Sequence, residues 1–369
     1  MSIFLGSILA LIVPLLFLGI IRTFDFYQTR QLHVLLKCLL WGMISFAPAT
    51  IIYKALEIIW PEHLGTINHF VVPIYEELLK SLILLYLFRH AKITYSVDGA
   101  LYGFAIGTGF AIVENFGYIY GPPSEAIIVA LQRVFSANLV HAISSAVIGI
   151  SLGMFYSKTS ETRWQVPVIG FLLAIGQHML YNNIAYIINA SDGIVPLGIV
   201  FVPGLPGIFF IRYFMQRGVK QSQDWIKEKL GIDNRMTQGE VTLIDRLTSS
   251  NDILFPVVER FGTETASKVE QLLYLQARLG IKRKSLDHVQ NNEGMRNSIE
   301  TEIQEMQTEM EDVRHSIGAY KMLFIRGLFT KEMVSVWEQM QAKIQERSAA
   351  TSGQKGGGVW SSLEERLKS

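Results

Sequence analysis

Three ionisable residues, Glu76, Glu77 and Lys80, stand close together in the middle of the apolar stretch 67–88. A charged group at the centre of a bilayer costs about 2.5–3.5 kcal/mol on insertion scales. A helix that served only as an anchor would have apolar residues at these positions. The three residues therefore indicate a functional site inside a membrane span.

Further polar residues lie in the neighbouring apolar stretches: Glu114, Asn115, Arg133, Asn138, His141, His178, Asn182 and Asn183. Counted from the ends of their stretches at 1.5 Å per residue, the two glutamates of 67–88, Glu114 and the two histidines are expected at a similar depth. Glu76 and Lys80 have the i,i+4 spacing that favours an ion pair. Glu77 is rotated from Glu76 by about 100° and is expected to face a different partner.

This set of residue types suits the activation of water. A carboxylate can take a proton from water and return it to a leaving amine, and histidine or asparagine can stabilise the oxyanion formed on a carbonyl. Glutamate and histidine are also ordinary zinc ligands, so a divalent metal at the same place is equally compatible. Both versions give hydrolysis of a peptide bond within the bilayer.

Each residue also has a simpler interpretation. A single histidine in a span is most often a packing or hydrogen-bonding group, Arg133 could extend towards the membrane surface, and Lys80 could serve only as the counter-ion of Glu76. A buried glutamate could also be the relay of an ion-coupled transporter or membrane sensor, which remains the alternative function. The adjacent pair Glu76 and Glu77 is harder to explain in this way, because neighbouring buried carboxylates oppose each other's ionisation.

The composition divides the chain into a membrane part and a soluble part. Half of the 369 residues are apolar, and residues 218–369 contain 43 of the 65 charged side chains. We therefore expect a membrane-embedded core at 1–217 and a water-soluble domain at 218–347, followed by residues 348–369. The single cysteine excludes a disulfide within the chain, and the balanced charge gives no case for nucleic acid as a partner.

About seven spans of a helical bundle in the cell membrane are predicted, at 2–21, 36–60, 67–88, 99–120, 126–156, 165–189 and 193–216. The run 126–156 is long for one span and is expected to tilt or to extend past the membrane. Lysine and arginine lie in alternate links, at 22–37, 89–98, 157–164 and after 216. The N-terminus is therefore expected outside and the C-terminal domain in the cytoplasm.

The C-terminal domain is predicted to be helical, with apolar positions at helical spacing in 265–280, 286–318 and 319–346. These stripes favour a packed bundle or a coiled-coil pair, with a surface for a protein partner or for self-association. Residues 348–358 have the composition of a flexible linker, and a short tail helix follows. The whole chain is thus expected to be all-α.

The polar residues of the spans resemble the motifs of the PrsW family of intramembrane proteases, which belongs with the CAAX-prenyl endopeptidases and bacteriocin-processing enzymes. YEELLK at 75–80 resembles its EExxK motif, and GFAIVENFGY at 109–118 resembles FxxxE. Residues 133–153 resemble its third segment, and FLLAIGQHMLYN at 171–182 its fourth. The four motifs occur in the family's order, each on its own span, and cover roughly residues 65–190.

The resemblance implies an intramembrane endopeptidase that acts on a membrane protein or peptide, with the first cleavage of an anti-sigma factor as the best-known family role. It assigns catalysis to Glu76, Glu77, Glu114, His141, His178 and Asn182, supported by Lys80, Asn115 and Arg133. A metal such as zinc would be held by Glu77, Glu114, His141 and His178, whereas a metal-free glutamic mechanism is equally compatible. Either Glu76 or Glu77 can be the base. The C-terminal domain departs from the family, and a scaffold with an inactive core is the third interpretation.

Overall fold

The computed structural model describes residues 1–23, 32–90, 92–93, 95–120, 125–155, 164–189, 205–230, 254–289 and 293–327. Every regular element among these residues is a helix, as the predicted all-α class requires. Internal contacts divide the chain into two units. The first is Met1–Ile232 with Tyr274–Met310, and the second is Asp233–Leu273 with Glu311–Ser369.

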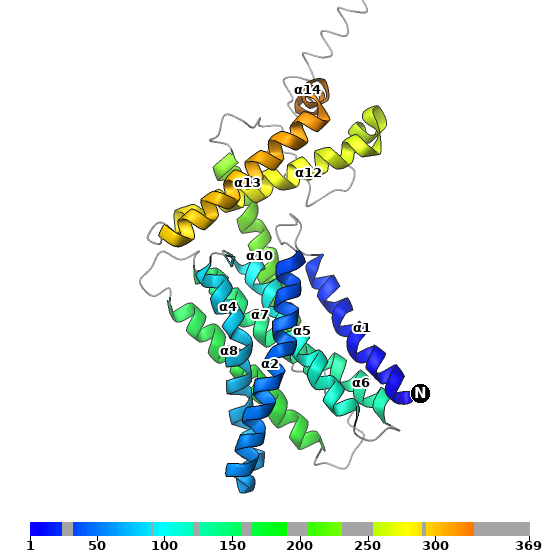
Figure 1. The fold of residues 1–369 in the computed structure, drawn as a ribbon, viewed down its shortest axis with the longest axis vertical. Coiled ribbons are helices and arrows are strands. Elements are labelled where there is room, and N and C mark those ends of the chain that lie inside the picture. The colour runs from blue at the N-terminus through cyan, green and yellow to red at the C-terminus, as the bar shows by residue number, and fades with distance from the viewer. Residues whose placement is uncertain are drawn as a thin grey trace, which may run out of the picture. The chain divides into compact units, whose positions relative to one another are not determined.

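The first unit contains the helices of the membrane core (Figure 1), which are α1 (Ser2–Arg22), α2 (Leu32–Ile59), α4 (Val72–Arg89), α5 (Ser96–Ile119), α6 (Ala126–Phe135), α7 (Ala137–Phe155) and α8 (Gln165–Asn189). Among the described residues, five stretches are long and apolar enough to cross a membrane: α1, α2, α5, α6 together with α7, and most of α8. The sequence predicted about seven. α4 is not among the five because it carries Glu76, Glu77 and Lys80, and residues 193–204 of the last predicted span lie outside the described residues.

The long apolar run 126–156 is divided at Ser136 into α6 and α7. Ser136 has φ −122° and ψ −82°, which ends α6. Its Oγ donates to the carbonyl of Gln132 (2.6 Å) and lies 3.0 Å from the hydroxyl oxygen of Tyr181 on α8. The run still counts as one candidate span, Ala126–Phe155, but it is interrupted at Ser136 and is not one continuous helix. The extra length forms a break, and α6 lies beside α1 (Figure 1), with Ala10, Ala126 and Ala130 buried together.

A short irregular segment precedes α4. It consists of η1 (Pro61–His63), α3 (Leu64–Thr66) and the π-helical turn η2 (Ile67–Val71). Pro73 stands in the first turn of α4, a position where proline is common. The predicted span 67–88 thus begins with a π-helical turn, a form that is common near functional sites.

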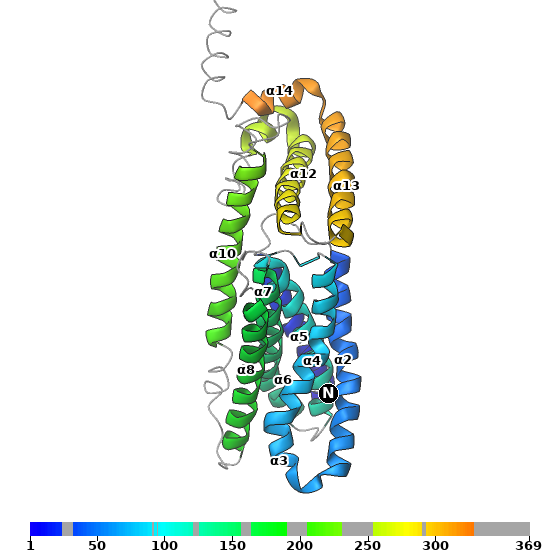
Figure 2. The ribbon, with the colours of Figure 1, turned by 90° about the vertical axis from the view of Figure 1, so that its left-hand side faces the viewer.

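The central helix of the core is α5, which is buried along most of its length and packs between α2 and α7 (Figure 2). Its backbone touches that of α7. A methyl group added at Gly107 would lie 2.1 Å from the carbonyl oxygen of His141. Small residues allow such close approach of membrane helices. We call this contact the glycine seam, formed by Gly99, Gly103 and Gly107 of α5 against Gly149, Ser145 and His141 of α7.

Replacing Gly107 by alanine is expected to lower the thermal stability of the protein. The added methyl would have to displace the α7 backbone that carries His141, and overpacking of this kind costs about 1–3 kcal/mol. The measurement is the melting temperature of the purified protein in detergent. Gly176→Ala on α8 is the matched control, because no atom lies within 4 Å of the added carbon. Equal melting temperatures for the two variants would contradict a close-packed seam.

The C-terminal helices bury the predicted apolar stripes. In α12 (Phe255–His288) the buried residues include Ala266, Val269, Leu272, Leu273, Leu275 and Leu279, and in α13 (Glu293–Ile317) they include Ile299, Ile303, Met306, Met310 and Val313. In the first unit, Lys282 of α12 pairs with Glu302 of α13 at 2.7 Å. α10 (Leu205–Leu230) continues without a break across position 217.

In the second unit, Lys321 of α14 (Ala319–Gly327) donates to the hydroxyl of Thr265 at 3.0 Å. Gly318, with φ +89°, separates α13 from α14. The remainder of the last predicted domain helix, 328–346, lies outside the described residues. The same holds for the predicted linker 348–358 and the tail helix.

Candidate active site

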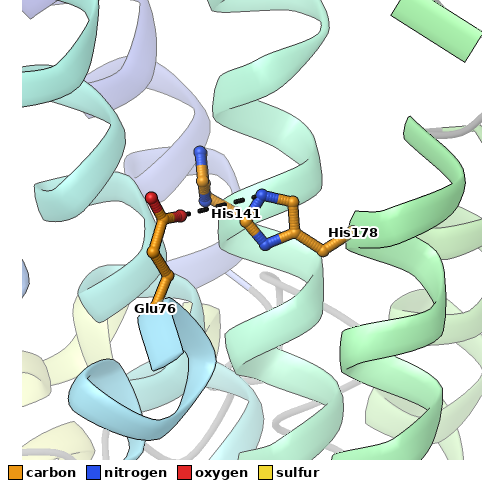
Figure 3. Close-up of side chains that lie close together, drawn as sticks. All are labelled: Glu76, His141 and His178. Atoms are coloured by element: carbon orange, nitrogen blue, oxygen red, sulfur yellow. Dashed lines mark ion pairs between the residues drawn. The ribbon is translucent and has the colours of Figure 1, made fainter. Parts of the chain in front are cut away.

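Three buried side chains from three helices point towards one another in Figure 3: Glu76 of α4, His141 of α7 and His178 of α8. The carboxylate Oε2 of Glu76 lies 3.7 Å from Nε2 of His178. The two imidazole rings meet edge to face, with their centroids 4.7 Å apart. These residues are far apart in the sequence, so the convergence is a property of the helix packing.

The same three residues could hold a metal ion. Each offers one ligand atom, and these atoms all lie within 4.8 Å of one another. A carboxylate oxygen and two imidazole nitrogens are ordinary zinc ligands, and a catalytic zinc site typically has three protein ligands and one open position. The donor set therefore fits a catalytic divalent metal.

Glu77 contacts the other ring nitrogen of His178. Its Oε1 accepts from Nδ1 of His178 at 2.9 Å and from Nζ of Lys80 at 2.6 Å. Glu77 and Lys80 are both fully buried. The expectation that Glu76 and Glu77 face different partners therefore needs correction, because both reach His178, at opposite nitrogens.

Lys80 was expected to pair with Glu76, and this prediction was wrong. Positions i+3 and i+4 share one face of a helix, so helical spacing allowed either glutamate as the partner. The ammonium of Lys80 lies 3.0 Å from Nδ1 of His141 and 4.7 Å from the centre of the Phe110 ring. These contacts from other helices hold it on the side of Glu77.

Glu114 of α5 holds His141. Its Oε2 lies 2.7 Å from Nε2 of His141 and 2.8 Å from Nη2 of Arg133 on α6. The sequence allowed two interpretations of Arg133, an outward orientation or a role at the site. Its contact with Glu114 places it at the site. Each histidine thus has a carboxylate on one ring nitrogen, an arrangement that fixes the tautomer and orientation of metal-binding histidines.

Three of the four asparagines singled out from the sequence have structural partners, whereas the buried amide of Asn138 on α7 has none among the described residues. The amide oxygen of Asn115 accepts from Nε of Arg133 at 2.8 Å. The amide of Asn182 donates to the carbonyl of Asn68 in η2 at 3.0 Å, which fastens α8 to the π-helical turn before α4. Asn183 donates to the carbonyl of Met179 in its own helix.

Two tyrosines at the site were not singled out from the sequence. The guanidinium carbon of Arg133 lies 3.7 Å from the centre of the Tyr118 ring. The hydroxyl of Tyr181 contacts Ser136 at the break between α6 and α7. Tyr118 follows Glu114 by four residues, and Tyr181 follows His178 by three. Helical spacing from the two motif residues was the signal that could have found them.

The part of the chain that contains these residues is similar to known proteins. Residues 30–208 match a protein family described as PrsW family intramembrane metalloprotease. Protease PrsW of Bacillus subtilis (strain 168) is 26% identical over 206 residues, which cover 54% of this chain and 87% of the relative. Protease PrsW of Shouchella clausii (strain KSM-K16) is 27% identical over 163 residues, which cover 43% and 74%. No solved structure matches the chain significantly.

Proposed function

Because the chain belongs to the PrsW family of intramembrane proteases, we propose that it hydrolyses a peptide bond of a membrane protein at the group formed by Glu76, Glu77, His141 and His178. One observation carries the proposal. A carboxylate and two imidazoles converge inside a membrane helix bundle, and each imidazole is oriented by a further glutamate.

Glu76, His141 and His178 are the proposed zinc ligands. A zinc ion held there would supply Lewis-acid activation of a water molecule and of the scissile carbonyl. The chain itself orients the two histidines, through Glu77 at Nδ1 of His178 and Glu114 at Nε2 of His141. Outer partners of this kind typically contribute about 10–100-fold to metal affinity or activity.

Glu77 is the proposed general base. Its Oε1 is occupied by His178 and Lys80, whereas Oε2 is buried without a hydrogen-bond partner among the described residues. Oε2 is therefore the atom that can receive a proton from the attacking water and return it to the leaving amine. Lys80 compensates the charge of the carboxylate in this apolar environment.

Asn182 is proposed to act on the carbonyl oxygen of the substrate. Its amide is anchored on the backbone of Asn68 through one N–H. The other N–H would donate to the oxygen as negative charge develops there, as in other sites that stabilise an oxyanion.

The proposed substrate is a membrane-spanning protein that is cut in its extracytoplasmic part. The distribution of lysine and arginine supports an outside N-terminus and cytoplasmic C-terminal helices. An anti-sigma factor is the substrate class that the resemblance to the family implies. The C-terminal helices are proposed to bind a protein partner.

Chelation of zinc from the purified full-length protein is expected to abolish cleavage of a tagged single-span membrane reporter in liposomes. Elemental analysis should find about one zinc per chain, and adding zinc back should restore activity. His178→Ala should lose the metal, whereas His63→Ala, at an exposed position in η1, should keep it. Full activity of zinc-free protein would contradict the metal mechanism and support a glutamic one.

A further inference from the structure

The guanidinium group of Arg133 is enclosed by three residues of α5. Its Nη2 lies 2.8 Å from Oε2 of Glu114, and its Nε donates to the amide oxygen of Asn115 at 2.8 Å. Its central carbon lies 3.7 Å from the centre of the Tyr118 ring. Since a guanidinium is planar and presents its donors in a fixed fork, contacts on its edge and its face hold it in one orientation.

The carboxylate oxygen that Arg133 contacts is the one that holds His141. Oε2 of Glu114 is shared between Nη2 of Arg133 and Nε2 of His141. A carboxylate accepts hydrogen bonds, so the proton of a neutral His141 lies on Nε2 and the lone pair stays on Nδ1. Nδ1 is also the nitrogen that accepts from the ammonium of Lys80, so a metal bound at His141 would take the place of that hydrogen bond.

The break at Ser136 lies between the two residues that share this oxygen. In a continuous helix, Arg133 and His141 would be separated by about 12 Å along the axis and by about 80° around it. Ending α6 at Ser136 and starting α7 at Ala137 brings both side chains to the same carboxylate.

We propose that Arg133, held over Tyr118, is a positioning residue that acts on His141 through Glu114. This proposal rests on the function proposed above and states how Arg133 contributes to it. Without Arg133 the carboxylate of Glu114 would be free to rotate away from His141. His141 would then lose the partner that fixes its tautomer and the direction of its ring.

The test is a double-mutant cycle on the full-length protein, with Arg133→Met, Glu114→Gln and both together. Zinc affinity is measured by competition with a chromophoric chelator, and the rate of reporter cleavage is measured in parallel. Arg133→Met and Glu114→Gln are each expected to weaken zinc binding and cleavage by about 10–100-fold, the usual effect of losing an outer partner of a metal ligand. The double variant should be no worse than Glu114→Gln alone, because Arg133 acts only through that residue.

Two pairs of variants separate positioning from folding. Arg133→Lys keeps the charge without the fork and should recover part of the zinc affinity. Tyr118→Phe keeps the ring that lies against Arg133 and Tyr118→Leu removes it, so zinc affinity should be several-fold lower in Tyr118→Leu than in Tyr118→Phe. Tyr118 is exposed, so neither change should disturb the core, and melting temperatures will report any general loss of stability.

Multiplicative effects in the double variant would overturn the inference, as would wild-type zinc affinity and cleavage in Arg133→Met. If His178→Ala loses zinc and activity while Arg133→Met does not, the inference fails and the proposed function stands. If His178→Ala cleaves normally, the proposed function fails, and the inference fails with it.

Discussion

Replacing Glu77 by glutamine or His178 by alanine is expected to lower the rate of cleavage by about 10³-fold or more. Loss of a general base alone typically costs about 10²–10⁴-fold. Glutamine preserves the shape of Glu77 but cannot take a proton from water. His178→Ala removes the ring that joins Glu76 to Glu77. The measurement is the rate of reporter cleavage in liposomes at equal protein concentration.

The matched control for both variants is Asn183→Ala. Asn183 lies on the same helix as His178, and among the described residues its amide donates to a carbonyl of its own helix. We expect wild-type cleavage from this control and normal membrane accumulation of all three variants. Wild-type rates in Glu77→Gln or His178→Ala would exclude the corresponding residue from the chemistry.

Replacing Lys80 by methionine is expected to destabilise the fold strongly. Lys80 and Glu77 form an ion pair in which both side chains are fully buried. Removing one partner of a buried pair leaves an uncompensated charge and typically costs about 3–5 kcal/mol. The melting temperature of the purified protein in detergent should fall by several degrees.

The double variant Lys80→Met with Glu77→Gln identifies the cause of that loss. It removes both charges, and replacing a whole buried pair is often close to neutral. Its melting temperature is therefore expected near that of the wild type, although it should not cleave. A double variant as unstable as Lys80→Met alone would show that the packing of the lysine, and not the unpaired glutamate, was responsible.

The sequence was sufficient for those features that depend on one helix at a time. Apolar length predicted the helices of the core, and the depth of each polar residue along its helix predicted which residues meet. The partner of Lys80 was predicted incorrectly, because helical spacing cannot choose between i+3 and i+4. His141 and Phe110, on two other helices, decide it.

The break at Ser136 also could not be predicted from the sequence. Residues 130–142 contain neither proline nor glycine, so neither of the two strongest helix-breaking residue types marks the end of α6. The break depends on contacts made after folding, such as that of Ser136 with Tyr181 on α8. For the same reason the sequence could not show that Arg133 and His141, eight positions apart, reach one carboxylate.

The glycine seam also fixes the register of α5 against α7. Each step of four residues along α5 from Gly99 to Gly107 is matched by a step of four back along α7 from Gly149 to His141. A slide of one turn would move Glu114 by about 5.4 Å relative to His141, and the touching backbones prevent it. Single helices adapt to a thicker or thinner bilayer by tilting, whereas these two must tilt together. Acyl-chain length should therefore change which residue of a spanning substrate reaches the site, while the geometry of the site stays the same.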